Sequence, residues 1–289
     1  MKTAIMTDTN SGISVEEGKQ LGIYVMPMPV LIDDICFLEG IDITAEQLYE
    51  AMEADKKTTT SQPSPGDLMD MWNAILTEGY DEIVYMPMTS GLSGSCQNAA
   101  LLAEDFDSKV YVVDNHRISV TLKESALQAK RMADAGKSAK VIKESLEATA
   151  YDTSIYLTVA SLKYLQKSGR LSASASMLGT ILNIKPILSF QGEKIDAIGK
   201  VRGMKVCEKK LISTLQEDIA SRFADVPVEK LQVAVAGTLR TKEDIDRWLG
   251  LVQSAFPNQK VYYDNLPCSI ATHTGPDAMG IGVYVIHEK

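Results

Sequence analysis

A loop made almost entirely of glycine and hydroxyl residues is the stretch of this 289-residue sequence whose side chains are best suited to binding chemistry. It reads SGLSGS, from Ser90 to Ser95, between an apolar run at 82–88 and an alanine-rich segment. That order predicts a strand, a loop and the start of a helix. Hydroxyl groups bind anions, as do the unsatisfied N–H groups and the positive dipole end of a helix N-terminus. The loop therefore predicts an anion site, and a capped turn without a ligand is the alternative.

Three familiar loop motifs fail here, each at a named position. A P-loop needs a lysine after its last glycine, and Ser95 and Cys96 follow Gly94 instead. A dinucleotide fingerprint needs three spaced glycines, and the loop has Gly91 and Gly94 alone. The nucleophile elbow G-x-S-x-G is broken because Ser95 occupies the place of its last glycine. The motifs give no support for nucleotide binding, and the hydroxyl groups and the helix start remain as the basis for an anion site.

A second hydroxyl cluster, TTTSQPSPGD at 58–67, allows two interpretations. Ser61 or Ser64 could cap the next helix, with Pro65 in its first turn. If the cluster instead lies beside Ser93, two loops of neutral donors converge on one site.

Arg170 and His273 are the charged or titratable side chains suited to an anion. Arg170, in KSGRLS, could bind a carboxylate or phosphate through two hydrogen bonds, or be an ordinary surface arginine. His273 lies between two threonines and before Gly275, so we expect it on a loop, where it could donate to an anion or be a solvent-exposed turn histidine. A serine hydrolase of acyl esters is the alternative function, with Ser93 as nucleophile, His273 as base and Asp264 as its partner. A regulator that binds a sugar phosphate or nucleotide phosphate is a third possibility.

Composition disfavours several other classes of protein. The formal net charge is −9, with 45% hydrophobic and 23% charged residues, so nucleic acid is a poor partner. Four scattered cysteines form no metal or disulfide pattern, and the aspartates near predicted strand ends have no ligand spacing, so no metal site is predicted. No stretch has the length of a signal peptide or an integral membrane segment, and a cytoplasmic protein is the simplest expectation.

Short apolar runs alternate with helix-like segments through the first half of the chain. Strands are predicted at 3–8, 24–32, 82–88 and 109–114. Ser14 is expected to begin one helix, and Thr44 with Gln47 forms a capping box for another. This alternation predicts a mostly parallel sheet covered on both faces.

The pattern begins again after residue 151. Strands are predicted at 154–160, 185–190, 230–237, 260–265 and 281–287, and long helices at 203–224 and 241–255. We therefore expect two α/β domains, residues 1–151 and residues 152–289. Ligands of such sheets bind beyond the carboxyl ends of strands, where the hydroxyl-rich loops are expected.

Taken together, these loops resemble those of the DegV family of fatty-acid-binding proteins. The matching stretches are TDTNSGI (7–13), TSQPSPGD (60–67), SGLSGSCQNA (90–99), VVD (112–114), SGRLS (168–172), KPIL (185–188), KVRG (200–203) and HTGPDAMG (273–280). They occur in the family's order and span nearly the whole chain, so the ordered set is more specific than any one motif.

The resemblance implies a lipid-binding carrier rather than an enzyme. It implies an N-terminal three-layer domain with a mostly parallel sheet and a C-terminal α/β domain with a mixed sheet. A palmitate-like fatty acid would lie in a buried tunnel between them, lined in part by 171–188, with no other cofactor. Its carboxyl group would be held by residues of four motifs: Thr60, Ser61, Ser93, Gly94, Ser95, Arg170, His273 and Thr274.

A partner is also implied by the resemblance. In members that serve fatty acid kinase systems, the bound acyl group is presented to a separate ATP-dependent kinase subunit. Arg202, in the KVR motif, would contribute to docking that subunit.

The sequence departs from the family pattern in two places. The family commonly has HTGPG, and Asp277 replaces the last glycine. After Asp114 the family usually has serine and a helix of small residues, and this chain has Asn115, His116 and Arg117. Acyl chain length and oligomeric state are not encoded in any motif.

Overall fold

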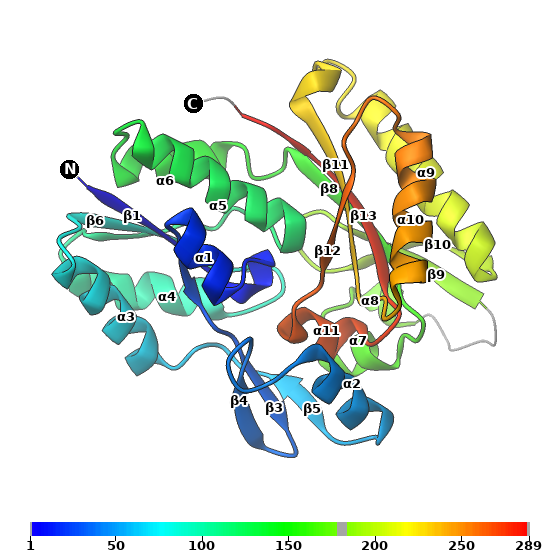
Figure 1. The fold of residues 1–289 in the computed structure, drawn as a ribbon, viewed down its shortest axis with the longest axis horizontal. Coiled ribbons are helices and arrows are strands. Elements are labelled where there is room, and N and C mark those ends of the chain that lie inside the picture. The colour runs from blue at the N-terminus through cyan, green and yellow to red at the C-terminus, as the bar shows by residue number, and fades with distance from the viewer. Residues whose placement is uncertain (1, 178–183, 288–289) are drawn as a thin grey trace. The chain divides into compact units, whose positions relative to one another are not determined.

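A parallel sheet of four strands organises the first half of the chain. A computed structural model describes residues 2–177 and 184–287 of the whole chain. Strands β1 (Thr3–Asp8), β2 (Tyr24–Met26), β6 (Glu82–Met86) and β7 (Val110–Val112) lie in the order β2-β1-β6-β7, and each neighbouring pair is parallel. Helices α1 (Val15–Leu21), α5 (Ser119–Asp134) and α6 (Ala139–Ala148) pack on one face, and α3 (Pro65–Thr77) and α4 (Ser95–Ala103) on the other (Figure 1). The predicted three-layer arrangement is confirmed.

Alternate residues of β6 show how both faces are buried. Val84 packs in the cluster under α5 and α6, whereas Tyr85 packs in the cluster with Trp72 of α3. Since helices cover both faces, every residue of β1 and β6 is buried. The parallel direction brings the carboxyl ends of β1, β6 and β7 to one edge. Asp8 at the end of β1, the loop after Met86 and Asp114 after β7 lie there.

Residues 24–32, expected as one strand, form two strands in different sheets. Pro27 separates β2 from β3 (Pro29–Ile32), and β3 pairs antiparallel with β4 (Ile35–Leu38) and β5 (Thr58–Thr60). Proline has no N–H and cannot donate within a strand ladder, so the chain leaves the parallel sheet there. Asp33 and Asp34 have positive φ and form the tight turn of the β3–β4 hairpin.

The helix starts expected in this half are confirmed. The side chain of Ser14 accepts from the Glu17 N–H ahead of α1. Thr44 and Gln47 form the capping box of α2 (Ala45–Glu53).

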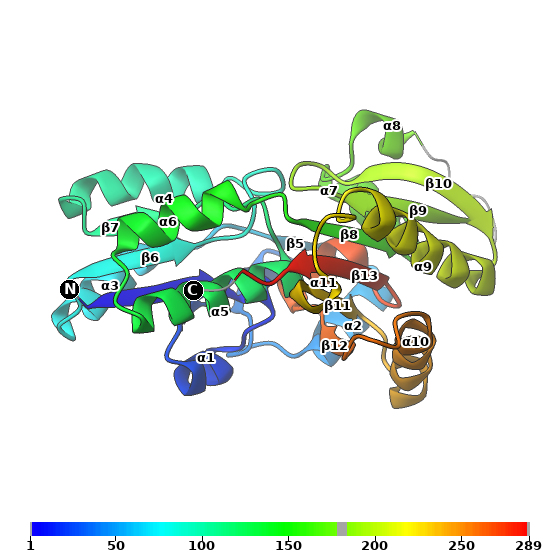
Figure 2. The same cartoon turned by 90° about the horizontal axis from the view of Figure 1, so that it is seen from above.

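A mixed sheet of six strands organises the second half. Strands β8 (Thr153–Thr158), β9 (Ile184–Phe190), β10 (Asp196–Arg202), β11 (Leu231–Gly237), β12 (Tyr262–Asn265) and β13 (Met279–Val285) lie in the order β10-β9-β8-β13-β11-β12. The pair β11 and β12 is parallel, and the other pairs are antiparallel. Helix α9 (Met204–Ser221) runs along β9 (Figure 2), and together with α10 (Lys242–Ala255) it buries Leu211 and Trp248 against the sheet. The mixed sheet was expected.

Strand β10 was not predicted from the sequence. It lies at the edge of the sheet, most of its residues are exposed, and Gly199 follows a shift in its pairing with β9. An exposed edge strand needs no apolar alternation, so its sequence carries little signal.

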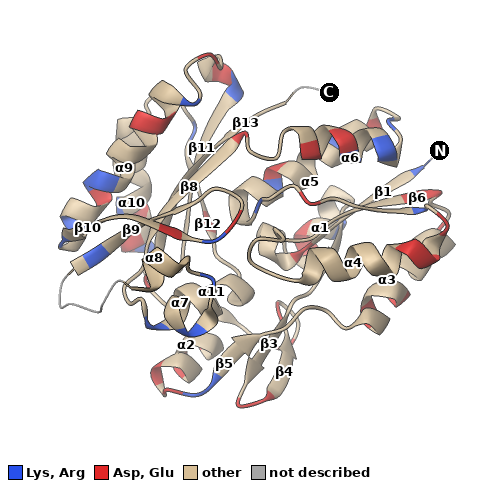
Figure 3. Cartoon of the chain, turned by 180° about the vertical axis from the view of Figure 1, so that it is seen from behind, with Lys and Arg blue, Asp and Glu red and all other residues tan. Residues whose placement is uncertain are grey.

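Contacts divide the described chain into two compact units. The first comprises residues 2–151 with Pro267–Ser269 and His287, and the second comprises residues 152–266 and 270–286. Acidic and basic residues are interspersed along the helices (Figure 3). On α6, Lys140 pairs with Glu144 and Lys143 with Glu147. None of the helices within the described ranges is long and apolar enough to cross a membrane.

Candidate functional site

The hydroxyl loop lies where β6 meets α4, as predicted. Ser95 is the first residue of α4, and Gly94 precedes it as an N-cap that contributes no side-chain hydrogen bond. The Ser93 Oγ lies 2.9 Å from the Ser95 Oγ and accepts the Ser95 N–H at 3.2 Å. The Ser93 hydroxyl therefore also satisfies an amide at the start of α4, as the capping interpretation requires.

Capping does not use up the Ser93 hydroxyl. A hydroxyl has one proton to donate and two lone pairs, and the Ser95 amide occupies one lone pair. If Ser95 donates in the pair of hydroxyls, the Ser93 proton remains for a ligand. A carboxylate oxygen would be a suitable acceptor.

The two serines of the second hydroxyl cluster have different surroundings. The Ser64 Oγ accepts the Asp67 N–H at 3.1 Å and caps α3. Ser61 is exposed, and its N–H donates to the Pro29 carbonyl at 3.3 Å, while Thr60 ends β5. An added Cβ on Gly94 would lie 3.8 Å from the Gln62 Oε1, so this loop and the SGLSGS loop approach each other. The first unit thus brings both predicted hydroxyl loops together.

The charge of Arg170 acts on His273 within the second unit. Burial is the main cause that lowers the pKa of His273 from 6.5 to about 4, and the charge of Arg170 lowers it further. Burial also lowers the pKa of Arg170, whose Nη1 donates to the Ser168 carbonyl. At neutral pH the imidazole is uncharged and can donate one N–H, so the positive charge here belongs to Arg170.

His273 lies in a helix, not on the loop that we expected from its glycine and proline neighbours. Helix α11 (Cys268–Thr274) ends directly after it, and the Gly275 N–H donates to the Ala271 carbonyl at 2.7 Å. Gly275 has φ +76°, and an added Cβ would lie 2.3 Å from the Tyr164 ring. The glycine therefore ends the helix and allows the ring of Tyr164 to approach the backbone.

Thr274, also expected at the ligand, is buried and its hydroxyl bonds locally. The Thr274 Oγ1 donates toward the Ile270 and Gly275 carbonyls, each at 3.4 Å. Asp277, which replaces the family glycine, has φ +58° and is exposed. The left-handed backbone explains why glycine suits this position, and exposure spares the Asp277 carboxylate a desolvation cost.

Other expected residues have simple positions. Arg202 is exposed at the end of the edge strand β10. Of the stretch 171–188 expected along an acyl tunnel, residues 178–183 lie outside the described residues. Across residues 2–177 and 184–287, no three His, Cys, Asp or Glu side chains are grouped so as to hold a metal ion.

Asp8 and Asp114 flank the hydroxyl loop, a role that the sequence did not reveal. The Asp8 Oδ2 accepts the Met88 N–H at 3.0 Å, and the Asp114 Oδ1 accepts the Ser90 N–H at 3.3 Å. Asp8 is fully buried, and this burial raises its pKa from 3.8 to about 6. Asp8 ends β1 and Asp114 lies two residues after β7. These positions near strand ends were the available signal, although the aspartates showed no ligand spacing.

The comparisons with known proteins agree on one family. A family model described as an uncharacterised protein of the DegV family matches residues 2–285. A DegV domain-containing protein of Caldanaerobacter subterraneus is 31% identical over 97% of this chain and 98% of its own.

Solved structures give the same result. DegV of Bacillus subtilis, described as a fatty acid binding protein, is 27% identical with a TM-score of 0.85, covering 99% of each chain. A stearic-acid-binding protein of Eubacterium ventriosum is 25% identical with a TM-score of 0.85, covering 98% of each chain.

Proposed function

This chain belongs to the DegV family, and on that premise we propose that it binds a long-chain fatty acid whose carboxyl group is held by its hydroxyl loops. The observation that carries the proposal is the approach of Gly94 to Gln62, which brings the loop with Ser93 beside the loop with Thr60 and Ser61. Two similar solved structures are fatty acid binding proteins by description. The proposal joins that description to a group of neutral donors in this chain.

Neutral donors suit a buried carboxylate. Burying an ionised carboxylate without partners is very costly, and hydroxyl and amide donors offset that cost. The Ser93 hydroxyl and the N-terminal amides of α4 are such donors. Burial of the acyl chain supplies affinity at about 0.8 kcal/mol per methylene, so the head-group contacts set orientation more than affinity.

Arg170 and His273, both in the second unit, differ in what each could offer to a carboxylate. Arg170 supplies positive charge, and the uncharged His273 supplies an N–H donor. A histidine whose pKa is about 4 is a weak general base near neutral pH, since an effective base has a pKa near the working pH. This argues for binding rather than ester hydrolysis.

The test is to identify what the purified protein carries. Solvent extraction followed by mass spectrometry is expected to release a fatty acid, and delipidated protein is expected to take up palmitate. Protein that is empty and takes up no fatty acid would end the proposal. Phosphorylated metabolites in the extract would favour the phosphate regulator, and labelling of Ser93 by a serine-directed covalent probe would favour the hydrolase.

We extend the proposal to a kinase partner that phosphorylates the bound carboxyl group, with Arg202 at its docking surface. Arg202 is exposed on an edge strand, where a partner can reach it. Arg202→Ala is expected to leave palmitate affinity unchanged and to slow acyl phosphate formation by an added kinase subunit. Lys205→Ala, exposed in the first turn of α9, is the matched control. Equal rates for Arg202→Ala and the unmodified protein would remove Arg202 from this role.

A further inference from the structure

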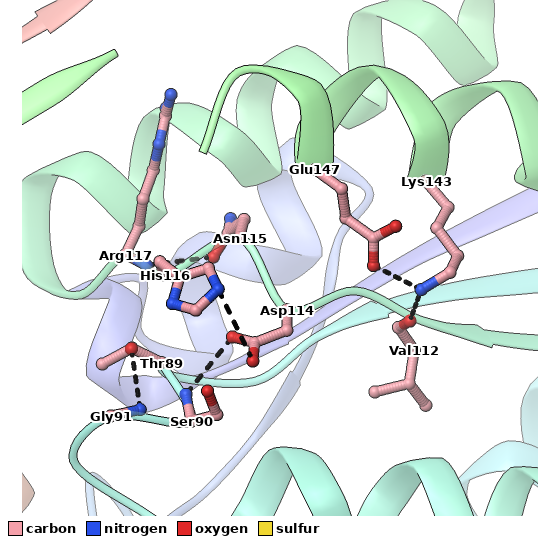
Figure 4. Close-up of polar contacts among 10 residues, drawn as sticks. All are labelled: Thr89, Ser90, Gly91, Val112, Asp114, Asn115, His116, Arg117, Lys143 and Glu147. Atoms are coloured by element: carbon pink, nitrogen blue, oxygen red, sulfur yellow. Dashed lines mark hydrogen bonds and ion pairs between the residues drawn. The ribbon is translucent and has the colours of Figure 1, made fainter. Parts of the chain in front are cut away.

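The peptide group between Thr89 and Ser90 controls the shape of the hydroxyl loop. Its carbonyl accepts the N–H groups of Leu92 and Ser93, both at 3.3 Å. Its own N–H, from Ser90, donates to the Asp114 Oδ1 (Figure 4). A peptide group is planar, so an acceptor that fixes its N–H also fixes the direction of its carbonyl. The position of Ser93 thus depends on a side chain 21 positions further along the sequence.

Neighbouring bonds support the same peptide group. The Thr89 N–H donates to the Arg117 carbonyl at 3.0 Å, and the Gly91 N–H donates to the Thr89 Oγ1 at 3.1 Å. The Met88 N–H is held by Asp8. Asp8, Arg117 and Asp114 thus each accept an N–H of this stretch from another segment. Of the three, Asp114 alone accepts the Ser90 N–H, which belongs to the peptide group whose carbonyl accepts the Ser93 N–H.

Asp114 is itself held on both sides. Before it, the Lys143 Nζ donates to the Val112 carbonyl at 2.5 Å and pairs with Glu147 (Figure 4). After it, the Arg117 N–H donates to the Asn115 Oδ1 at 3.3 Å. The Asp114 side chain therefore extends from a segment that is held in place, so its carboxylate can hold the loop in one position.

The buried Arg117 side chain anchors the far end of this segment. It is 1% exposed, and its Nε donates to the Ala150 carbonyl at 3.3 Å while its Nη2 donates to the Thr149 carbonyl at 2.5 Å. These carbonyls follow α6, where the negative end of the helix dipole favours a cation. His116 has φ +53° and stacks on Tyr151, a backbone conformation that persists when its surroundings impose it.

We infer that Asp114 is a positioning residue for the head-group site: its Oδ1 orients the Thr89–Ser90 peptide and thereby sets the Ser93 hydroxyl toward the carboxyl group of the ligand. The inference rests on the proposed function and assigns Asp114 to its site. The role requires an acceptor atom and not a negative charge, since a carboxylate near an anionic head group is otherwise unfavourable.

Two substitutions of Asp114 distinguish a role as hydrogen-bond acceptor from a role as negative charge. Asp114→Asn keeps an oxygen acceptor without the charge, and Asp114→Ala removes both. We expect Asp114→Ala to weaken palmitate binding by delipidated protein roughly threefold to tenfold, the effect of one hydrogen bond. Asp114→Asn is expected to stay within about twofold of the unmodified protein. Asp70→Ala, an exposed aspartate on α3, is the matched control.

A double-mutant cycle shows whether Asp114 acts through Ser93. In a Ser93→Ala background, Asp114→Ala is expected to cause no further loss of affinity, because the hydroxyl that it positions is already absent. Amide hydrogen exchange of Leu92 and Ser93 should accelerate in Asp114→Ala and remain slow in Asp114→Asn.

Three results would overturn the inference: equal weakening by Asp114→Asn and Asp114→Ala, additive losses in the cycle, or unchanged exchange at Leu92 and Ser93. If the unmodified protein binds no palmitate, the proposed function fails instead, and the exchange experiment still reports whether Asp114 orients the loop.

Discussion

The two units differ in the kind of group that each could present to an anion. In the first, Ser93, Ser95 and the start of α4 are neutral donors, and the nearby charges are the carboxylates of Asp8 and Asp114, which accept loop amides. In the second, Arg170 carries a positive charge, and burial keeps His273 uncharged. Hydroxyls and amides bind a carboxylate through directed hydrogen bonds without net charge, whereas a guanidinium adds net attraction to its directed hydrogen bonds. The contrast predicts that loss of a neutral donor in the first unit and loss of the positive charge in the second can be measured separately.

The largest effect is expected from a substitution of Gly275, which lies in the second unit. Gly275→Ala would force a side chain into a positive-φ position and into the Tyr164 ring, destabilising the second unit by about 4 kcal/mol. Chemical unfolding can be followed separately through the two tryptophans, Trp72 in the first unit and Trp248 in the second. Only the Trp248 transition should move.

Gly250→Ala is the control for that substitution. Gly250 lies within α10 and an added Cβ meets nothing within 4 Å, so stability should rise by up to ~1 kcal/mol. A Gly275→Ala protein as stable as the unmodified one would contradict the close approach of Tyr164.

Acid should affect the two units in opposite directions. The folded pKa of His273 is about 4 against 6.5 ordinarily, so between these values the unfolded chain binds the extra proton and stability rises with pH. The folded pKa of Asp8 is about 6 against 3.8, so the folded chain binds the extra proton there and stability falls as pH rises. Each effect amounts to about 3 kcal/mol across its window.

Unfolding from pH 4 to 7, observed through Trp72 and Trp248, measures both trends. His273→Asn should flatten the Trp248 profile and Asp8→Asn the Trp72 profile. Profiles that rise together in both units would show that burial does not act on these groups as inferred.

Removing the charge of Arg170 should weaken attraction for the ligand. Arg170→Met is expected to reduce palmitate affinity by about 2 kcal/mol, and Arg170→Lys by less because it keeps the charge. In the ligand-free protein, Arg170→Met should also raise the pKa of His273, which should stay below 6.5 because burial is the larger cause. Calorimetry and NMR titration give the two values, and an unchanged His273 pKa would mean that the two side chains do not interact.

The smallest effect is expected from the hydroxyl loop. Ser93→Ala should weaken palmitate binding by about 1 kcal/mol, and Ser93→Thr by less. Ser64→Ala is the matched control, because Ser64 caps α3 and should cost about 1 kcal/mol of stability without changing affinity. If Ser93→Ala lowers stability and leaves affinity unchanged, Ser93 is a cap like Ser64, and the contrast between the units disappears.

Much of the fold could be predicted from local sequence. The parallel sheet followed from apolar runs between helix signals, and the caps at Ser14 and Thr44 from residue types three positions apart. The break at Pro27 and the edge strand β10 were missed. The apolar run continues through the proline, and an exposed edge imposes no periodicity, so neither feature leaves a local pattern.

The sequence by itself determined the loops that carry donors, the secondary structure that positions SGLSGS, and the family, through motifs in a fixed order. Tertiary structure decided the state of the groups: His273 sits in a helix and is uncharged, Asp8 is half-neutralised near pH 6, and Asp114 serves as an acceptor for Ser90. The reason is physical, because hydroxyl-rich loops and caps depend on neighbours in sequence. A pKa depends on desolvation and charge summed over residues that only the fold brings together.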